Sequence, residues 1–259
     1  MILRERQNRI IKALRVDGAA SVQELAAALS VSAATIRRDL EMLDRNGELV
    51  RTWGGAVLVP GQTAQDHDDG EPVESPFEEA GDLDLKRRMA VAAAGMVQDG
   101  QVVILDIGTT TPQIAELLRG RDITVITTNL AVFDVLRDDE AVRLVLLGGV
   151  VRRNYRTLVG SLAEAALEHV SADVLFLSCT GVRANGHVVD NMAVEAPIKQ
   201  SMIAAAERVV LLASEAKFPG TGALRLCSLT DVDVVITTTG APEETLAHSR
   251  NAGGEVITT

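Results

Sequence analysis

From residue 86 onward, short runs of apolar, β-branched residues alternate with stretches that have helical spacing. Each run is four or five residues long, which is the length of a strand rather than of a buried helix. Strands that are apolar throughout are typical of parallel sheets, because helices cover both faces of such sheets. The pattern therefore predicts an α/β domain. We expect strands over 102–105, 123–126, 143–147, 174–177, 209–213 and 234–237, and helices over 86–97, 113–118, 130–137 and 195–206.

In such a sheet, ligands bind beyond the carboxyl ends of the strands. The turn at 106–111 follows the first predicted strand and combines a glycine with three threonines, and Pro112 opens the helix behind it. A helix N-terminus attracts anions, and hydroxyl groups donate hydrogen bonds to them, so this turn is a candidate phosphate site. The same residues would also suit a βα turn that is merely well capped.

Polar and cationic residues after the other predicted strands point to the same edge of the sheet. Lys217 and Arg152 could neutralise an anion held at the turn. Glu195 and Lys199 lie four residues apart on one predicted helix, so they either face the ligand or form a simple surface pair. The candidate ligand-binding residues are Asp106, Gly108, Thr109, Thr110, Thr111, Thr128, Asn129, Gly148, Gly149, Arg152, Gly181, Glu195, Lys199 and Lys217.

Capping residues near the N-terminus predict three short helices in succession. Apolar residues at helical spacing over 4–15 indicate the first helix. Ser21 and Glu24 have the spacing of a capping box that opens the second helix, and Ser32 caps a third at 33–45. About three residues separate the second and third helices, which is the tight connection of a helix-turn-helix.

The third predicted helix has two different faces. Ile36, Leu40 and Leu43 lie within about 40° of one another, so we expect them to pack inward. The opposite face carries small and basic residues, which can enter a major groove and reach phosphates or base edges; a solvated face on a small helical bundle is the alternative. The segment 48–57 predicts a β-hairpin wing, from which Arg51 could reach the DNA backbone. The candidate DNA-binding residues are Ser32, Ala33, Ala34, Thr35, Arg37, Arg38 and Arg51.

Charge is divided unevenly along the chain. The whole sequence carries −11, but residues 1–57 contain nine basic and seven acidic side chains, a net charge of about +2. The segment 60–84 has many acids, no Lys or Arg and no apolar periodicity, which favours a flexible linker over a long ordered loop. We therefore predict a DNA-binding domain at 1–59, an acidic linker at 60–84 and a larger α/β domain at 85–259.

Composition excludes several classes of protein. Aromatic residues make up only 2%, too few for stacking on single-stranded nucleic acid. Cys179 and Cys227 are far apart and form no metal-spaced pair, which excludes disulfide scaffolds and zinc fingers. No apolar run reaches the ~18 residues of a membrane span, and the N-terminus lacks the apolar core of a signal peptide. We expect a soluble cytoplasmic protein without a metal or a cofactor.

Segments of both predicted domains resemble one known family. The N-terminal segments 31–40, 47–51 and 54–56 resemble the DNA-binding domain of DeoR-family bacterial transcriptional regulators, and Thr35-Ile36-Arg37-Arg38-Asp39-Leu40 is the most specific string. Segments of the second domain resemble the sensor domain of that family. They lie at 106–111, 128–130, 147–149, 159–160, 181 and 217–218.

The resemblance implies a winged helix-turn-helix domain joined to a sensor domain similar in fold to ribose-5-phosphate isomerase. It further implies a repressor of a carbohydrate-metabolism operon, which a phosphorylated sugar effector releases from double-stranded operator DNA. We expect a homo-oligomer, a dimer or tetramer, that makes no membrane contact. The sequence departs from the family at Ile107, where a serine is usual, at Arg183, near a usual acid, and at Ser214, where an aspartate is usual. An aspartate would bind sugar hydroxyls, whereas Arg183 would favour a second anion.

Two other functions are possible for such a chain. A sugar-phosphate isomerase carrying a DNA-binding module would use Asp106 as its base, but the strand ends offer no second well-placed carboxylate. An effector-independent DNA-binding protein would use its second domain only to oligomerise. We expect a regulator and not an enzyme. Turnover of pentose phosphates would favour the first alternative, and indifference to every small molecule the second.

Overall fold

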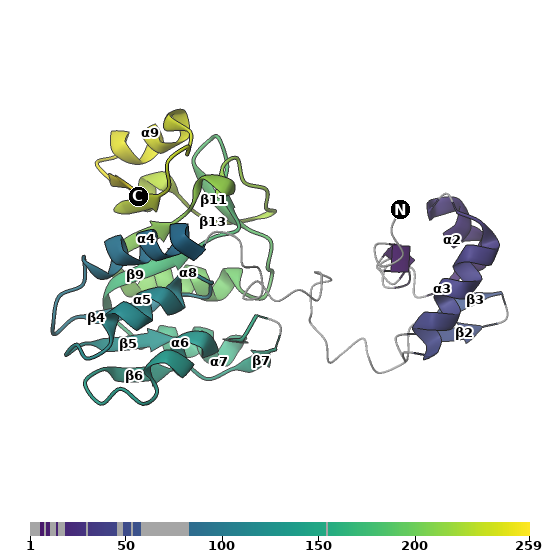
Figure 1. The fold of residues 1–259 in the computed structure, drawn as a ribbon, viewed down its shortest axis with the longest axis horizontal. Helices are drawn as coiled ribbons and strands as arrows, with labels where there is room; N and C mark the ends of the chain where they lie inside the picture. Colours follow the sequence, from purple (N-terminus) through teal and green to yellow (C-terminus); the bar gives the residue numbers. More distant parts are fainter. Residues whose placement is uncertain are drawn as a thin grey trace. The chain divides into compact units, whose positions relative to one another are not determined.

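The computed structural model describes residues 6–7, 9–10, 14, 19–29, 31–45, 49–52, 54–57, 83–153 and 155–259. The chain divides into two compact units, residues 1–72 and 73–259, and each is described by itself (Figure 1). The predicted linker lies outside the described residues except for its last two, Leu83 and Asp84. Most of the first predicted helix also lies outside them.

The first unit contains helices α2 (Val22–Leu29) and α3 (Ala33–Arg45) and strands β1 (Ala19–Ser21), β2 (Val50–Thr52) and β3 (Gly55–Val57). The predicted capping box is confirmed, since the Ser21 amide donates to Glu24 Oε2 at 2.8 Å and the Glu24 amide donates to Ser21 Oγ at 3.2 Å. Ser32 Oγ accepts from the Thr35 amide at 3.1 Å and so caps α3 as predicted.

Strands β2 and β3 form the predicted hairpin, and β1, which the sequence did not indicate, pairs with β3. Gly55 permits this pairing, because a Cβ atom there would lie 2.2 Å from the carbonyl oxygen of Ala20. The predicted inward face of α3 is confirmed: Ile36, Leu40 and Leu43 are buried in the apolar core of this unit.

A seven-stranded parallel sheet forms the centre of the second unit, in the order β15-β14-β12-β9-β4-β5-β6. Its strands are β4 (Val102–Leu105), β5 (Thr124–Thr127), β6 (Arg143–Leu146), β9 (Ala172–Ser178), β12 (Ala206–Leu212), β14 (Val234–Thr237) and β15 (Glu255–Thr258). All six predicted strands are present. The sequence missed β15, an edge strand that is partly exposed and therefore lacks the continuous apolar pattern of the buried strands.

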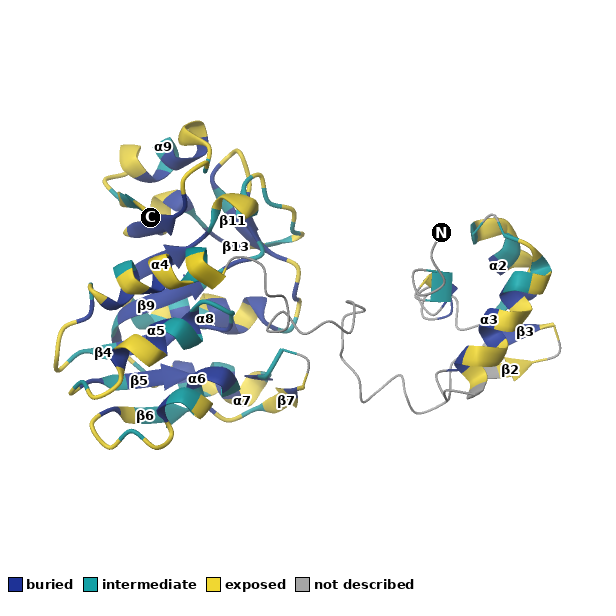
Figure 2. Ribbon diagram, in the orientation of Figure 1, coloured by how far each residue is buried: buried dark blue, intermediate teal, exposed yellow. Residues whose placement is uncertain are grey.

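Helices cover both faces of this sheet (Figure 1), which confirms the predicted fold class. Helices α4 (Leu83–Ala94), α5 (Thr111–Leu118) and α6 (Leu130–Leu136) pack on one face, and α7 (Ser161–Leu167), α8 (Ala196–Ala205) and α9 (Glu243–Asn251) pack on the other. Successive strand residues alternate between the two apolar clusters, so that Val103 and Leu105 face the first set of helices and Ile104 the second. Figure 2 shows the buried strands between helices whose outer faces are exposed.

The strand order reverses between β4 and β9. From β4 the chain adds β5 and β6 on one side, and it then returns to place β9 on the other side of β4. In open α/β sheets, ligands bind in the crevice beyond the carboxyl ends of the strands at such a reversal. The residues at these two strand ends, Asp106 and Ser178, therefore mark where a ligand site is expected.

Two small antiparallel sheets interrupt the alternation of strands and helices. One is a hairpin of β7 (Val150–Arg152) and β8 (Thr157–Val159), and the other consists of β10 (Gly181–Val182), β11 (His187–Asp190) and β13 (Leu224–Ser228). The sequence did not indicate these strands, because each either has only two or three residues or contains polar residues that interrupt the apolar run. Two 3-10 turns are η1 (Glu215–Lys217) and η2 (Leu229–Asp231). No helix among the described residues is long and apolar enough to cross a membrane.

Candidate functional site

The outer face of α3 presents small and basic residues. Arg37 and Arg38 are exposed, and neither forms a hydrogen bond or an ion pair with another described residue. Ala34 is exposed, and Thr35 is half-buried with its Oγ1 atom 2.8 Å from Ser32 Oγ. The two guanidinium groups are therefore available to phosphate oxygens or base edges.

The hairpin is tied to the same helix. The amide of Arg51, on β2, donates to Asp44 Oδ1 on α3 at 3.2 Å, while the Arg51 side chain stays exposed. The structure thus places the predicted DNA-binding residues at the first turns of α3 and on the strand bonded to it.

A buried cluster of charged side chains lies where the strand order reverses. The Oδ2 atom of Asp106 accepts from the amide of Ser178 at 2.8 Å and from its Oγ at 2.7 Å. The Nζ atom of Lys199, on α8, lies 3.0 Å from Asp106 Oδ2 and 3.2 Å from Asp190 Oδ2. All three charged side chains are at most 3% exposed, so one buried ammonium group lies between two buried carboxylates.

The neighbouring carboxylates keep the amine of Lys199 protonated. Burial alone would lower the pKa of Lys199, but the carboxylates of Asp106, Asp190 and Glu195 outweigh burial and raise it above the usual value. The lysine therefore remains an ammonium ion throughout the physiological pH range.

A second buried ion pair joins the hairpin to α8. Arg152 Nη1, on β7, donates to Glu195 Oε1 at the start of α8. The guanidinium carbon of Arg152 lies 4.3 Å from the centre of the Tyr155 ring, and its Nη2 contacts Met192 Sδ. Burial raises the pKa of Glu195 to about 7, and the nearby Lys199 and Arg152 charges only partly oppose this shift. Glu195 is therefore the group in this region that titrates near neutral pH.

In the turn after β4, some side chains form hydrogen bonds that hold the turn in place, and others are available to a ligand. Thr111 Oγ1 donates to the Asp106 carbonyl at 2.7 Å, and Asn129 Nδ2 donates to the Gly108 carbonyl at 3.2 Å, so Thr111 and Asn129 brace the turn. The half-buried Thr109 and Thr110 hydroxyls bond to no described residue. Asp106 Oδ1 is also buried and has no hydrogen-bond partner among the described residues.

Several other predicted residues serve close packing. A Cβ atom on Gly149 would lie 2.6 Å from the Val159 carbonyl oxygen, and one on Gly181 would lie 2.3 Å from Gly220 Cα. A Cβ atom on Gly108 would lie 3.1 Å from the side chain of Ser178. Of the remaining predicted residues, Gly148 is exposed, Thr128 is buried with an unpartnered Oγ1, and Lys217 lies half-buried in η1.

Of the two alternatives for Glu195 and Lys199, the simple surface pair is excluded, because both residues are buried and each pairs with another residue. The expectation of no second carboxylate near Asp106 is wrong, because Asp190 shares Lys199 with it. Asp190 was missed because it ends a strand that the sequence did not reveal, and the only available indication was an acid after two valines.

The three departures from the family pattern lie in different surroundings. Ile107 is buried, and Ser214 is half-buried just before η1. Arg183 is exposed and donates from Nη2 to the Gly222 carbonyl, so it already has a partner. Cys179 is buried, and burial raises the pKa of its thiol to about 12.

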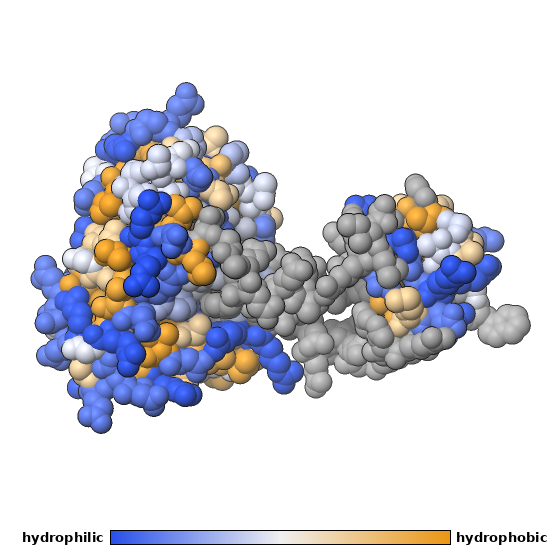
Figure 3. Space-filling view, viewed as in Figure 1, coloured by the Kyte–Doolittle hydropathy of each residue, from blue (hydrophilic) through white to orange (hydrophobic). Residues whose placement is uncertain are grey.

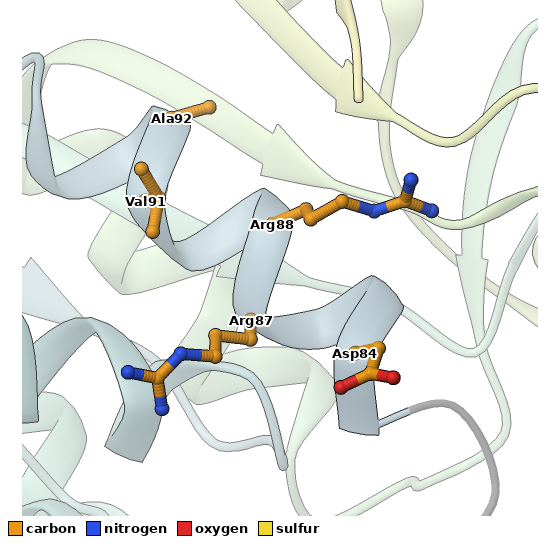
Figure 4. Close-up of a pocket in the computed structure, with 5 residues that line it drawn as sticks. All are labelled: Asp84, Arg87, Arg88, Val91 and Ala92. Atoms are coloured by element: carbon orange, nitrogen blue, oxygen red, sulfur yellow. The ribbon is translucent and has the colours of Figure 1, made fainter.

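A separate open pocket lies along α4 (Figure 4). It is lined by Asp84, Arg87, Arg88, Val91 and Ala92, and the two arginines point in different directions. Leu83 and Val91 on α4 are exposed although they are apolar. The face of this unit that Figure 3 draws has hydrophobic patches among hydrophilic ones. None of the predicted ligand-binding residues lines this pocket. Among the described residues, no group of acidic, histidine and cysteine side chains could hold a metal ion.

Comparison with known families identifies both units. Residues 6–61 match the DeoR-like helix-turn-helix domain, and residues 82–239 match the DeoR C terminal sensor domain.

Curated relatives match along nearly the whole chain. A candidate aga operon transcriptional repressor of Escherichia coli O157:H7 is 34% identical, over 98% of this chain and 93% of that protein. The transcriptional repressor GlcR of Bacillus subtilis is 31% identical, over 92% of this chain and 89% of that protein. Among solved structures, a ribose 5-phosphate isomerase A of Methanocaldococcus jannaschii is 19% identical, over 52% of this chain and 54% of that one. Its TM-score is 0.39.

Proposed function

Because the chain belongs to the DeoR family of DNA-binding transcriptional regulators, we propose that it represses a carbohydrate-metabolism operon and leaves its operator when a phosphorylated sugar binds. The observation that carries this proposal is the buried Asp106 Oδ1 atom at the reversal of the strand order, which has no hydrogen-bond partner among the described residues and lies next to two available threonine hydroxyls. The names of relatives support the class of operon, since one is the lactose phosphotransferase system repressor of Lactococcus lactis and another is the L-fucose operon activator of Haemophilus influenzae.

On the DNA side, the first turns of α3 enter the major groove. The exposed Arg37 and Arg38 reach phosphates or the edge of a guanine, and Thr35 contacts a neighbouring base edge. The small residues Ala33 and Ala34, behind the Ser32 cap, allow close approach. Arg51 on the hairpin contacts the adjacent backbone. The exposure of the three arginines supports their assignment, whereas Ala33 and Thr35 are half-buried.

On the effector side, the phosphate group sits at the turn before α5. The Thr109 and Thr110 hydroxyls and the helix N-terminus bind its oxygens, and Lys217 neutralises its charge. A sugar hydroxyl donates to Asp106 Oδ1, which needs a donor because a buried acceptor without a partner is costly. The remaining predicted residues shape this site: Thr111, Thr128, Asn129, Gly108, Gly148, Gly149, Gly181, Arg152, Glu195 and Lys199.

Repression requires paired recognition helices. We propose a homo-oligomer, a dimer or tetramer, whose α3 helices contact half-sites about one DNA turn apart or a multiple of it. Effector binding favours an arrangement of the protomers that no longer matches this spacing. The domain limits we propose are 1–59 for DNA binding, 60–84 for the linker and 85–259 for the sensor. Binding to operator DNA places the protein in the cytoplasm.

One observation favours a second function, a sugar-phosphate isomerase. The carboxyl group of Glu195, whose pKa is about 7, is suited to proton transfer near neutral pH. An assay of pentose phosphate turnover distinguishes the two functions, and a regulator yields no product above the background.

The proposal is tested by thermal unfolding of the full chain with a panel of sugar phosphates and their unphosphorylated counterparts. A ligand at ~100 times its Kd adds roughly 2.7 kcal/mol to the stability of the native state, and this raises Tm by several degrees. We expect only phosphorylated sugars to raise Tm. Equal shifts with unphosphorylated sugars would contradict the phosphate site, and no shift with any compound would contradict sugar sensing.

A further inference from the structure

A two-pronged ion pair joins the N-terminal helical segment to α3. Arg6 Nε donates to Asp39 Oδ2, and Arg6 Nη2 donates to Asp39 Oδ1 at 3.1 Å. The Asp39 side chain is 2% exposed and the Arg6 side chain 13%, although both residues are charged. Paired bonds between the planar guanidinium and carboxylate groups fix their relative orientation as well as their distance.

The pair extends an apolar contact between the same two segments. Arg6, Ile10 and Leu14 are spaced four residues apart, and each is helical in the described part of the N-terminal segment. Ile10 and Leu14 are buried in the same apolar cluster as Ile36 and Leu40 of α3. Apolar contacts are not directional and tolerate a small rotation of one helix against another. The Arg6–Asp39 pair does not tolerate such a rotation, because the rotation would break one of its two hydrogen bonds.

Asp39 directly follows the two arginines of the recognition face. On a helix, successive residues are about 100° apart, so a rotation of α3 that moves Asp39 moves Arg37 and Arg38 by the same angle. Reading a base edge depends on the direction of hydrogen bonds, whereas attraction to phosphates depends mainly on charge. A loosened α3 would therefore lose selectivity between DNA sequences before it lost general affinity for DNA.

We propose that the Arg6–Asp39 pair is a positioning contact that fixes the rotation of α3, and that sequence-selective DNA binding depends on it although neither side chain touches DNA. This inference rests on the proposed DNA-binding face. It assigns Arg6 a different role from that of the exposed arginines, because its guanidinium group is already neutralised by Asp39.

The test compares selectivity among full-length variants. An operator duplex is first selected with the wild-type chain from random-sequence DNA, and binding is then measured to this duplex and to a scrambled duplex of the same composition. The variants are Asp39→Asn, which keeps the side-chain size, and Arg6→Lys, which keeps the charge but loses the planar fork. Arg9→Lys, an exposed residue of the same segment, is the matched control.

We expect Asp39→Asn and Arg6→Lys each to lower the ratio of operator to scrambled affinity about tenfold, the scale of one mismatched base pair. Affinity for the scrambled duplex should stay within about twofold of wild type, and Arg9→Lys should leave both affinities unchanged. A direct phosphate contact would give other results. Arg6→Lys would then keep wild-type operator binding, and Asp39→Asn would strengthen binding to both duplexes, and either result overturns the proposal.

Two further readouts complete the test. Far-ultraviolet circular dichroism shows whether the N-terminal unit is folded at the assay temperature. If selectivity falls only in variants that are unfolded there, the pair merely stabilises the fold and the proposal is overturned. Arg38→Ala tests the underlying DNA-binding face separately. If Arg38→Ala loses selectivity while Asp39→Asn and Arg6→Lys keep it, only the positioning role fails; if Arg38→Ala stays fully selective, the proposed face itself fails.

Discussion

Replacing Lys199 by methionine should strongly destabilise the sensor unit. The substitution keeps the length of the side chain but removes the only ammonium group at 3.0 Å from Asp106 and 3.2 Å from Asp190 among the described residues. All three side chains are almost fully buried, so the two carboxylates would be left without their shared counter-charge. Removing one partner of a buried ion pair typically costs about 3–5 kcal/mol.

This cost can be read as a change in Tm. For a unit of this size, 1 kcal/mol corresponds to roughly 2–4 °C, so we expect Lys199→Met to lower Tm by roughly 6–20 °C. Lys86→Met is the matched control, since Lys86 is half-buried on α4 and forms no ion pair with a described residue. It should change Tm by less than about 2 °C. Thermal unfolding followed by circular dichroism measures both variants, and equal small shifts would refute the buried cluster.

Three further predictions concern the DNA-binding face, the effector and pH. Arg38→Ala should weaken operator binding at fixed salt by ~1–3 kcal/mol, as expected for a base contact; unchanged affinity would remove Arg38 from the readout. Lys217→Ala should abolish the response to sugar phosphates while leaving operator binding intact, and loss of both would show a folding defect instead. Burial raises the pKa of Glu195 from 4.5 to about 7, so the folded chain binds more protons than the unfolded chain between these values. The contribution of Glu195 to the free energy of unfolding is therefore fully present below about pH 4.5, and it is lost as the pH rises to about 7. Urea unfolding at several pH values should show a flatter dependence for Glu195→Gln, and an unchanged slope would contradict the assigned pKa.

The elements with local sequence signals could be predicted. The capping interactions of Ser21 with Glu24 and of Ser32 with Thr35 are encoded within four residues, and the structure shows both. The buried strands could be predicted for the same reason, because each is a continuous apolar run. Asp106 was identified as a candidate because it directly follows one of those runs.

The partners of the buried charges could not be predicted. A glutamate and a lysine four residues apart look the same on an exposed helix and on a buried one. Burial of Lys199 depends on Asp106 and Asp190, which distant strands bring to it. Thr111 and Asn129 raise the same difficulty, since a hydroxyl or amide near a strand end can bind a ligand or brace a turn. In this structure both brace the turn.

Measuring release from DNA shows whether a phosphorylated sugar controls operator binding. The full chain is bound to its selected operator duplex at fixed salt, and the dissociation constant is measured with each sugar phosphate and with its unphosphorylated counterpart. We expect at least one sugar phosphate to weaken operator binding at least about fivefold, the lower range of allosteric coupling, and its unphosphorylated counterpart to have no effect. An operator affinity that no sugar phosphate changes would contradict this expectation.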